Sequence, residues 1–222
     1  MSTPVQPIRI EVDPGTTVSG LLQAPPGARA AYVLAHGAGA GMDHAFMAEA
    51  AQGLAERGVA TLRYQFPYME RGSKRTDPPP VAHAAVRAAV ARAAQEFSGL
   101  RLYAGGKSFG GGMSSQAQAA APLQGVEGLV FLGFPLHPDG APSSTRAEHL
   151  RLVRIPMLFL QGTRDKLADI DRMRTLAAEL GEGATLAEIA EADHSFHVLV
   201  RSGRKNPEVM RELLDSAARW ML

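Results

Sequence analysis

One serine of this 222-residue chain stands in a pattern that suits nucleophilic chemistry. The segment Gly106-Lys107-Ser108-Phe109-Gly110 matches the spacing G-x-S-x-G. In this pattern the serine occupies a tight turn from a strand into a helix, and the glycines remove side chains that would collide with neighbouring backbone. The N-terminus of the helix directs its N–H groups at developing negative charge. The pattern predicts a nucleophile at Ser108; the alternative is a glycine-rich turn without chemistry.

A nucleophilic serine needs a base and a carboxylate that orients the base. Asp165 and His194 follow Ser108 in that order, and each of the three comes after a strand-type run. Ligand sites in open α/β sheets lie at the carboxyl ends of the strands, so we expect the three side chains to converge. Asp165 has the alternative of capping the next helix, and His194 that of bonding loop backbone. Asp193 is the weaker acid candidate because adjacent side chains rarely face each other.

Other ligand chemistries fit the sequence poorly. A phosphate-binding loop ending in Gly106-Lys107-Ser108 needs a glycine where Arg101 stands. A dinucleotide turn at Gly37 and Gly39 needs glycine or alanine at Met42. His194 and His197 lack the spacing and the glutamate of a zinc protease motif. The chain has no cysteine, which excludes disulfides, thiolate metal sites and a cysteine nucleophile. We therefore expect neither a cofactor nor a metal ion.

Residues around the nucleophile have candidate roles in binding. The backbone N–H groups of Phe109 and Ala38 are the candidates for an oxyanion hole, one after the nucleophile and one in the turn that follows an earlier strand. His36, in that same turn, is expected to make a structural hydrogen bond. His44, His83, His137 and His149 are expected at the surface.

Four further residues are candidates for substrate contacts. Lys107 flanks the nucleophile at the start of a helix, where an ammonium group attracts anions; the alternative is a solvated or ion-paired lysine. Phe66, Tyr68 and Met69 lie in the proline-rich loop 65–80. They are candidates for the wall of an acyl pocket, with ordinary core packing as the alternative.

The elements that must hold these residues alternate between strands and helices. Helical patterns include Phe46 to Leu54, Val86 to Phe97, a small-residue stretch up to Ala121, and Ile170 to Leu180. A last helix is expected from Asn206, which is predicted to cap it. This alternation predicts a mostly parallel sheet with helices on both faces. The irregular segment 135–153, with a single helical turn expected near Glu148, leaves little room for a cap domain. Strand-type runs are expected at residues 8–12, 21–22, 31–35, 59–64, 100–104, 126–132, 157–160 and 184–190, and the first two are candidates for an antiparallel hairpin at the edge of the sheet.

Composition excludes several classes of protein. Hydrophobic residues make up 45% and charged residues 20% of the chain, which argues against disorder. The formal net charge is +1, so no overall electrostatic attraction to nucleic acid is expected. No stretch approaches the roughly 20 apolar residues of a membrane helix, and the first residues lack the pattern of a signal peptide. We expect one cytoplasmic domain over residues 1–222, with no nucleic-acid or membrane partner.

From the strand at Ala31 to its end, the chain resembles the α/β-hydrolase superfamily. The resemblance rests on the His36-Gly37 turn, the Ser108 turn, the segment 155–165 and Asp193-His194-Ser195-Phe196. More narrowly, Gly105 to Gly111 and Phe66-Pro67-Tyr68-Met69 look like a small group of predicted hydrolases. That group is similar to dienelactone-hydrolase-like proteins and to the hydrolase-like domain of a subunit of the non-specific-lethal chromatin complex. The resemblance implies an α/β-hydrolase fold with an eight-stranded core and triad roles for Ser108, Asp165 and His194.

These observations predict a serine hydrolase that cleaves an ester, thioester or related acyl bond of a small molecule through an acyl-enzyme. True dienelactone hydrolases carry a cysteine nucleophile, so that substrate is not expected here. Two alternatives stay open. One is a peptidase that uses the same three residues, and the other is a non-catalytic protein-interaction module on the same fold.

Overall fold

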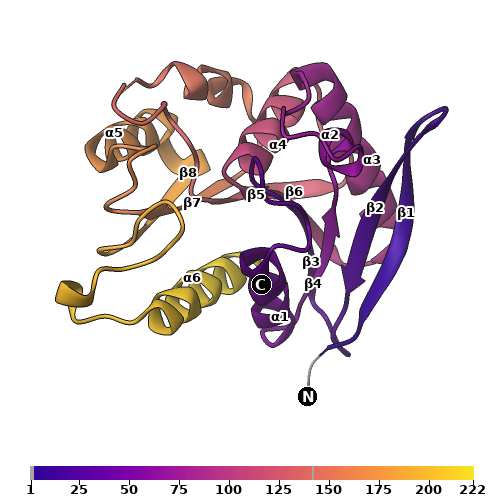
Figure 1. The fold of residues 1–222 in the computed structure, drawn as a ribbon, viewed down its shortest axis with the longest axis horizontal. Coiled ribbons are helices and arrows are strands. Elements are labelled where there is room, and N and C mark those ends of the chain that lie inside the picture. The colour runs from indigo at the N-terminus through magenta and orange to yellow at the C-terminus, as the bar shows by residue number, and fades with distance from the viewer. Residues whose placement is uncertain (1–2, 142) are drawn as a thin grey trace.

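The computed structural model describes residues 3–141 and 143–222 and contains one eight-stranded sheet with helices on both faces (Figure 1). The strand order is β1-β2-β4-β3-β5-β6-β7-β8. Strands β3 to β8 run parallel, whereas β2 pairs antiparallel with both β1 and β4. The strands are β1 (Val5–Asp13), β2 (Thr16–Gln23), β3 (Ala30–Ala35), β4 (Val59–Tyr64), β5 (Arg101–Lys107), β6 (Val126–Leu132), β7 (Met157–Gly162) and β8 (Ala184–Ile189).

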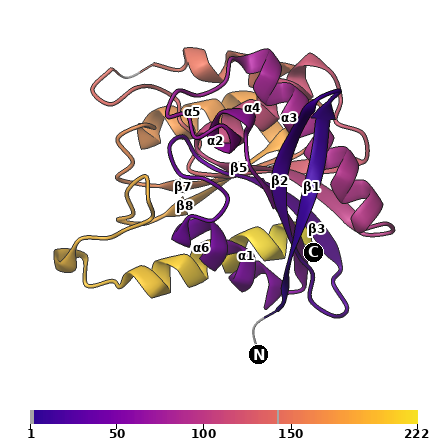
Figure 2. The same cartoon turned by 45° about the vertical axis from the view of Figure 1, so that its right-hand side comes forward.

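Two hydrophobic layers sandwich the sheet, and Figures 1 and 2 show the helices divided between its faces. Helices α1 (Ala45–Ala55) and α6 (Asn206–Met221) cover one face. Helices α3 (Pro79–Glu96), α4 (Phe109–Ala120) and α5 (Ile170–Leu180) cover the other, together with the 3₁₀ helix η1 (Thr145–Leu152). Three short helices complete the described fold: α2 (Pro67–Glu70), η2 (Gly181–Gly183) and η3 (Val200–Ser202).

Burial on both faces explains the composition of the central strands. All six residues of β3 are buried, as are all six of β4 and of β7. Strands covered on both sides read as continuous apolar runs, without the alternation of a half-exposed strand. The predicted mostly parallel α/β architecture is therefore confirmed, including the antiparallel hairpin at the edge formed by β1 and β2.

Two segments differ in detail from the sequence-based expectations. Asn206 was expected to cap α6, but its side chain accepts a hydrogen bond from the Val198 backbone N–H at 2.9 Å. The Glu208 carboxylate instead accepts from the backbone N–H of Lys205, the residue before the helix, at 3.1 Å. The connection from β6 to β7 holds η1, longer than the single turn expected, and no other helix or strand among its described residues. The prediction of a minimal cap or no cap domain is confirmed.

The topology gathers the chemically interesting turns at one edge of the sheet. The chain leaves β3 toward β4 on one side and reaches β5 on the other, so β3 lies at a switch in strand order. Such a switch opens a crevice at the carboxyl ends of the parallel strands. Residues 36–41, Ser108, Asp165 and His194 all follow the carboxyl ends of strands. Nowhere in residues 3–141 and 143–222 is a helix long and apolar enough to cross a membrane.

Candidate active site

Ser108 lies at the turn from β5 into α4 with a strained backbone. Its φ is 49° and its ψ is −114°. In the described chain, Ser108 is one of three non-glycine residues with positive φ. A residue held in such a region costs on the order of 1–3 kcal/mol, and strain of this kind concentrates at functional sites. The turn carries the serine clear of the strand and into the N-terminal end of α4.

The glycines of the turn are required by a close approach to β3. A Cβ atom at Gly106 would lie 2.1 Å from the carbonyl oxygen of Ala35, and one at Gly110 would lie 2.6 Å from the same oxygen. No side chain fits at either position without movement of the backbone. This approach also places the turn after β3 beside the nucleophile, because a Cβ atom at Gly37 would lie 3.8 Å from the Cβ of Ser108.

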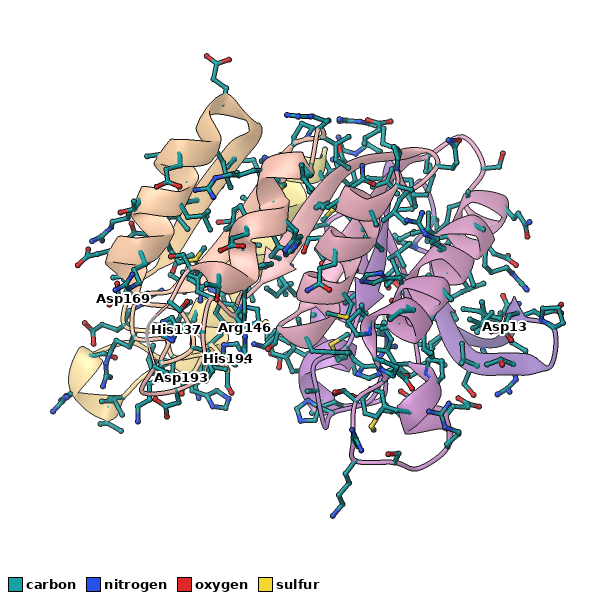
Figure 3. All side chains as sticks on the ribbon, turned by 90° about the horizontal axis from the view of Figure 1, so that it is seen from above. Asp13, His137, Arg146, Asp169, Asp193 and His194 are labelled. Atoms are coloured by element: carbon teal, nitrogen blue, oxygen red, sulfur yellow. The ribbon has the colours of Figure 1, made fainter. Side chains whose placement is uncertain are left out.

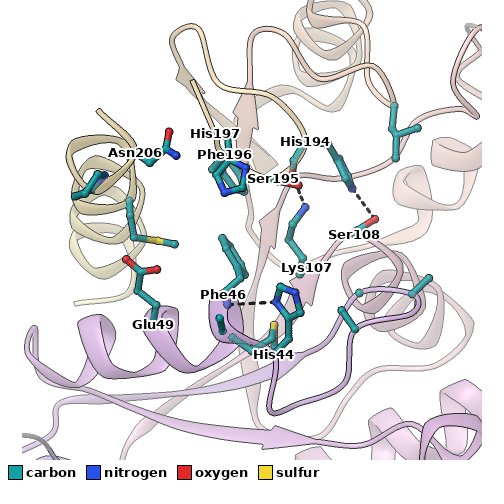
Figure 4. Close-up of a pocket in the computed structure, with 18 residues that line it drawn as sticks. His44, Phe46, Glu49, Lys107, Ser108, His194, Ser195, Phe196, His197 and Asn206 are labelled. Atoms are coloured by element: carbon teal, nitrogen blue, oxygen red, sulfur yellow. Dashed lines mark hydrogen bonds between the residues drawn. The ribbon is translucent and has the colours of Figure 1, made fainter. Parts of the chain in front are cut away.

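A continuous chain of hydrogen bonds joins Ser108, His194 and Asp165. Nε2 of His194 lies 2.9 Å from Oγ of Ser108, and Figure 4 shows this contact. Nδ1 of His194 lies 2.7 Å from Oδ2 of Asp165. The Asp165 side chain is fully buried, whereas the His194 side chain is 24% exposed. With the proton on Nδ1, the imidazole donates to Asp165 and accepts from the serine hydroxyl. The three residues predicted from chain order are thus brought together.

Neutral donors hold the buried carboxylate of Asp165. The Gln161 side-chain amide donates to Oδ2 at 2.5 Å, and the Leu167 backbone N–H donates to Oδ1 at 2.8 Å. The side-chain oxygen Oε1 of Gln161 in turn accepts a hydrogen bond from the Phe134 backbone N–H at 2.9 Å. Gln161 therefore links Asp165 to the chain after β6. Gln161 was not among the predicted site residues, although an amide side chain at the end of an apolar strand, where it is buried, is a usable signal.

His137 supports the same region and corrects a prediction. It was expected at the surface, but it is 3% exposed, and its Nε2 accepts from the Asp169 backbone N–H at 3.1 Å. Figure 3 shows His137 and Asp169 on the same side of the molecule as Asp193 and His194, far from Asp13 on the edge hairpin. The reason is that the segment after β6 folds over the loop that carries Asp165.

The turn after β3 is braced by two aromatic side chains. Buried His36 donates from Nδ1 to the Gly37 carbonyl at 2.8 Å and accepts at Nε2 from the Phe66 backbone N–H at 3.0 Å. Burial lowers the pKa of His36, which favours this neutral form. The Tyr68 hydroxyl accepts from the Gly39 backbone N–H at 3.3 Å. The structural role expected for His36 is confirmed.

The two residues predicted to supply the oxyanion hole are Phe109, which follows Ser108 directly, and Ala38, which lines the cavity. Phe109 is the first residue of α4, so its N–H has no acceptor within the helix. Ala38 lines the same cavity as Ser108 and follows Gly37 in the braced turn. The assignment of these two N–H groups to an oxyanion hole stays a prediction.

A cavity of about 790 Å³ opens over Ser108 and His194. Its walls come from the turn after β3, from α1, from the loop after β8 and from the start of α6, and most are apolar. The rings of Phe46 and Phe196 stack with their centroids 6.0 Å apart. The remaining lining residues include Ala38, Ala40, His44, Ala45, Met47, Glu49, Leu167, Ser195, His197, Asn206, Pro207 and Met210.

Phe66, Tyr68 and Met69 do not line this cavity, so the predicted acyl-pocket wall is wrong. Phe66 and Tyr68 are fully buried, and Met69 packs against the same core. The rings of Phe66 and Tyr68 both contact that of Phe109, at centroid distances of 5.2 and 6.2 Å. These side chains pack in the core, which was the alternative, because the loop after β4 turns toward α3 and α4.

Lys107 lines the cavity, is partly exposed and makes no ion pair in the described chain. Its Nζ donates to the backbone carbonyl of His194 at 2.6 Å. It also lies 5.9 Å from the ring centroid of Phe46 and 5.4 Å from that of Phe196. No carboxylate of the described chain lies within ion-pair distance of it. Burial lowers the pKa of Lys107 to about 8, although two nearby carboxylates oppose the shift.

Comparison with known proteins agrees with this architecture. A family model described as an alpha/beta hydrolase domain matches residues 28–222. A dienelactone hydrolase structure from Anabaena variabilis aligns with a TM-score of 0.78 at 22% identity, over 99% of this chain and 97% of that one. An α/β serine hydrolase without lid from Xanthomonas campestris aligns with a TM-score of 0.74 at 20% identity, over 100% and 97%.

An esterase domain from Rhodothermus marinus aligns with a TM-score of 0.71 at 15% identity, over 98% of this chain and 97% of that one. At such identities the alignments establish the shared fold. The narrower similarity to a chromatin-complex subunit, drawn from short motifs, stays a prediction.

Two glycines of α4 test the close approach at the turn. Gly110→Ala is expected to destabilise the protein by about 1–3 kcal/mol or more, because its Cβ would meet the Ala35 carbonyl at 2.6 Å. Gly112→Ala is the matched control, since a Cβ there has no neighbour within 4 Å. It is expected to stabilise the helix by roughly 0.5–1 kcal/mol. Urea unfolding measures both, and equal stability of the two variants would contradict the steric argument.

Gln161→Met tests the support of Asp165. The variant keeps the length of the side chain but leaves the buried Phe134 N–H without its acceptor, so a loss of about 1–3 kcal/mol in unfolding free energy is expected. Gln116→Met is the control, because the Gln116 side chain makes only a 3.4 Å contact with His83. Its effect should stay within about 0.5 kcal/mol. A Gln161 variant as stable as the control would refute a supporting role.

Proposed function

The chain belongs to the alpha/beta hydrolase family, and on that premise we propose that it is a serine hydrolase for esters, thioesters or related acyl compounds. The observation that carries the proposal is the hydrogen-bond chain from Ser108 through His194 to Asp165, whose first two members line the cavity. In this proposal Ser108 is the nucleophile, His194 the general base and Asp165 the group that orients the base.

The first step forms an acyl-enzyme. Oγ of Ser108 attacks the substrate carbonyl carbon while its proton passes to Nε2 of His194. Asp165 keeps its hydrogen bond to Nδ1–H and stabilises the imidazolium that forms. The backbone N–H groups of Ala38 and Phe109 receive the oxyanion, and loss of one such donor typically raises the barrier by ~3 kcal/mol.

The second step releases the acid and restores the serine. The tetrahedral intermediate collapses, its bond to the leaving oxygen or sulfur breaks, and Nε2–H of His194 protonates the departing alcohol or thiol. A water molecule then gives its proton to Nε2 and attacks the acyl carbon. When this second intermediate collapses, the proton returns to Oγ of Ser108. One water is consumed, and the sequence of steps requires no cofactor.

The cavity supports a small-molecule substrate. Its volume of about 790 Å³ falls in the range of roughly 300–1,000 Å³ that is usual for such ligands. Apolar walls suit an acyl chain or an apolar leaving group. The short connection between β6 and β7 leaves the site without a covering domain, which favours a substrate that enters directly from solvent.

Strain at Ser108 argues against the non-catalytic alternative. A module that only bound other proteins would gain nothing from a serine at φ 49°, or from a fully buried carboxylate that bonds a half-buried imidazole. The peptidase alternative uses the same residues and differs only in the bond that is cleaved, so it is separated by experiment.

Hydrolysis of p-nitrophenyl esters and of a matched p-nitroanilide tests the proposal. Measurable ester hydrolysis is expected, and Ser108→Ala and His194→Ala should each lower kcat by about 10³- to 10⁶-fold, with the double variant no worse. Asp165→Asn should cost about 10⁴-fold. Ser144→Ala, at an exposed site before η1, is the control with unchanged rates. Full activity in a folded Ser108→Ala protein would refute the mechanism, and faster amide than ester cleavage would favour a peptidase.

A further inference from the structure

Lys107 joins the strand that carries the nucleophile to the loop that carries the base. It is the last residue of β5, and Ser108 follows it directly. Its ammonium group lies 2.6 Å from the backbone oxygen of His194, and Figure 4 shows the side chain reaching toward that loop. Among the described residues, only two hydrogen bonds join the loop 190–198 to the segment 101–120, which contains β5, Ser108 and α4. They are this contact and the bond between His194 and Ser108.

The ammonium and the imidazole share one small space above the end of β6. A Cβ atom at Gly133 would lie 3.1 Å from Nζ of Lys107 and 3.5 Å from Nδ1 of His194. Gly133 has a φ of 72°, which is accessible to glycine and strained for other residues. The backbone there is therefore shaped to admit both groups.

The loop that presents His194 is itself strained. Glu191 and Phe196, on either side of His194, both have a φ of 61°. The Asp193 carboxylate accepts from the Ser195 and His197 backbone N–H groups at 2.8 and 2.9 Å, which closes the loop on itself. A loop of this kind keeps its shape through contacts to its neighbours. Lys107 supplies one of them and also packs against the Phe196 ring.

We propose that Lys107 is a positioning residue, whose ammonium group holds the His194 carbonyl and the rings of Phe46 and Phe196 and thereby keeps the imidazole in register with Ser108. The inference rests on the proposed function, and it replaces the expectation that Lys107 binds an anionic substrate. Because Nζ is engaged with a protein carbonyl and two ring faces, the charge acts on the protein's own loop.

The positive charge of Lys107 is disfavoured by its surroundings, because burial removes water from the ammonium group. Burial lowers the pKa of Lys107 to about 8, while the carboxylates of Asp165 and Asp193 act in the opposite direction. An unfolded chain would hold the proton up to a pKa of about 10.4, so the charged lysine lowers folding stability at pH 7, and this penalty disappears as pH rises from 8 to 10.4. The other titratable groups that face the cavity are His44, Glu49, His194 and His197.

Loss of the proton weakens the attachment of the loop. A neutral amine forms a weaker hydrogen bond to a carbonyl and has no cation–π attraction to the rings. Activity that depends on Lys107 should therefore fall as pH rises through about 8. Folding stability should rise over the same range, because the unfolded chain then binds more protons than the folded one, so a fall in activity near pH 8 is not explained by unfolding.

The test compares Lys107→Met and Lys107→Arg with wild type and with Lys166→Met, an exposed lysine beside Asp165. A neutral p-nitrophenyl ester is the substrate, and kcat and KM are measured from pH 6.5 to 9.5. Lys107→Met is expected to lower kcat on the order of 10- to 100-fold with little change in KM, since small misplacements of catalytic groups have effects of this size. The kcat of Lys107→Met should not fall as pH rises through about 8. Its free energy of unfolding in urea at pH 7 should equal or exceed that of wild type.

Lys107→Arg should recover much of the kcat and keep it above pH 8, because the guanidinium stays charged. Lys166→Met should behave as wild type. A carboxylate-bearing p-nitrophenyl ester is measured alongside the neutral one, to detect any direct contact of Lys107 with an anionic substrate. Three results would overturn the inference: unchanged kcat in Lys107→Met, a loss confined to the KM of the carboxylate-bearing ester, or a loss of stability that accompanies the loss of activity and that arginine does not rescue. An inactive wild type would remove the proposed function together with this inference, whereas an active wild type with an equally active Lys107→Met would remove this inference alone.

Discussion

The carbonyl oxygen of Ala35, at the end of β3, is the steric constraint around which the site is built. The turn from β5 into α4 approaches it so closely that neither Gly106 nor Gly110 has room for a Cβ atom. This approach sets Ser108 at a positive φ and brings the turn after β3 alongside it. The parallel order of the sheet then adds the turns after β7 and β8 at the same edge. One backbone contact thus accounts for the glycines on both sides of Ser108 and for the turn after β3 that lies beside it.

Two charged side chains near this contact, those of Asp165 and Lys107, are held in surroundings that disfavour a charge. Asp165 is a fully buried carboxylate that depends on donors from Gln161, Leu167 and His194. Lys107 is a cavity-lining ammonium whose pKa is lowered by burial. All three positive-φ non-glycine residues of the described chain lie at Ser108 or beside His194. Unfavourable backbone angles and unfavourably placed charges therefore occur together around Ser108 and His194, as is expected of a functional site.

Much of this arrangement could be predicted from the sequence, for physical reasons. Alternating apolar runs fix strands and helices, and parallel strands bring their carboxyl ends together, so the meeting of Ser108, Asp165 and His194 followed from their order along the chain. Hydrophobic pattern does not say which layer an apolar residue joins, and Phe66, Tyr68 and Met69 were therefore assigned to the wrong side. The cavity walls come from α1 and α6, at opposite ends of the chain, and no local pattern pairs Phe46 with Met210. Gln161 and Lys107 act through backbone groups of distant segments, which spacing cannot reveal.

The central claim is that the hydrogen bonds to His194 make Ser108 an activated nucleophile. The most direct measurement is reaction of the folded protein with a fluorophosphonate, followed by mass spectrometry to locate the adduct, with Ser108→Ala as the control. The account predicts one adduct per chain, located on Ser108 and absent from the control. A folded protein that forms no adduct, or that reacts equally well without Ser108, would contradict it.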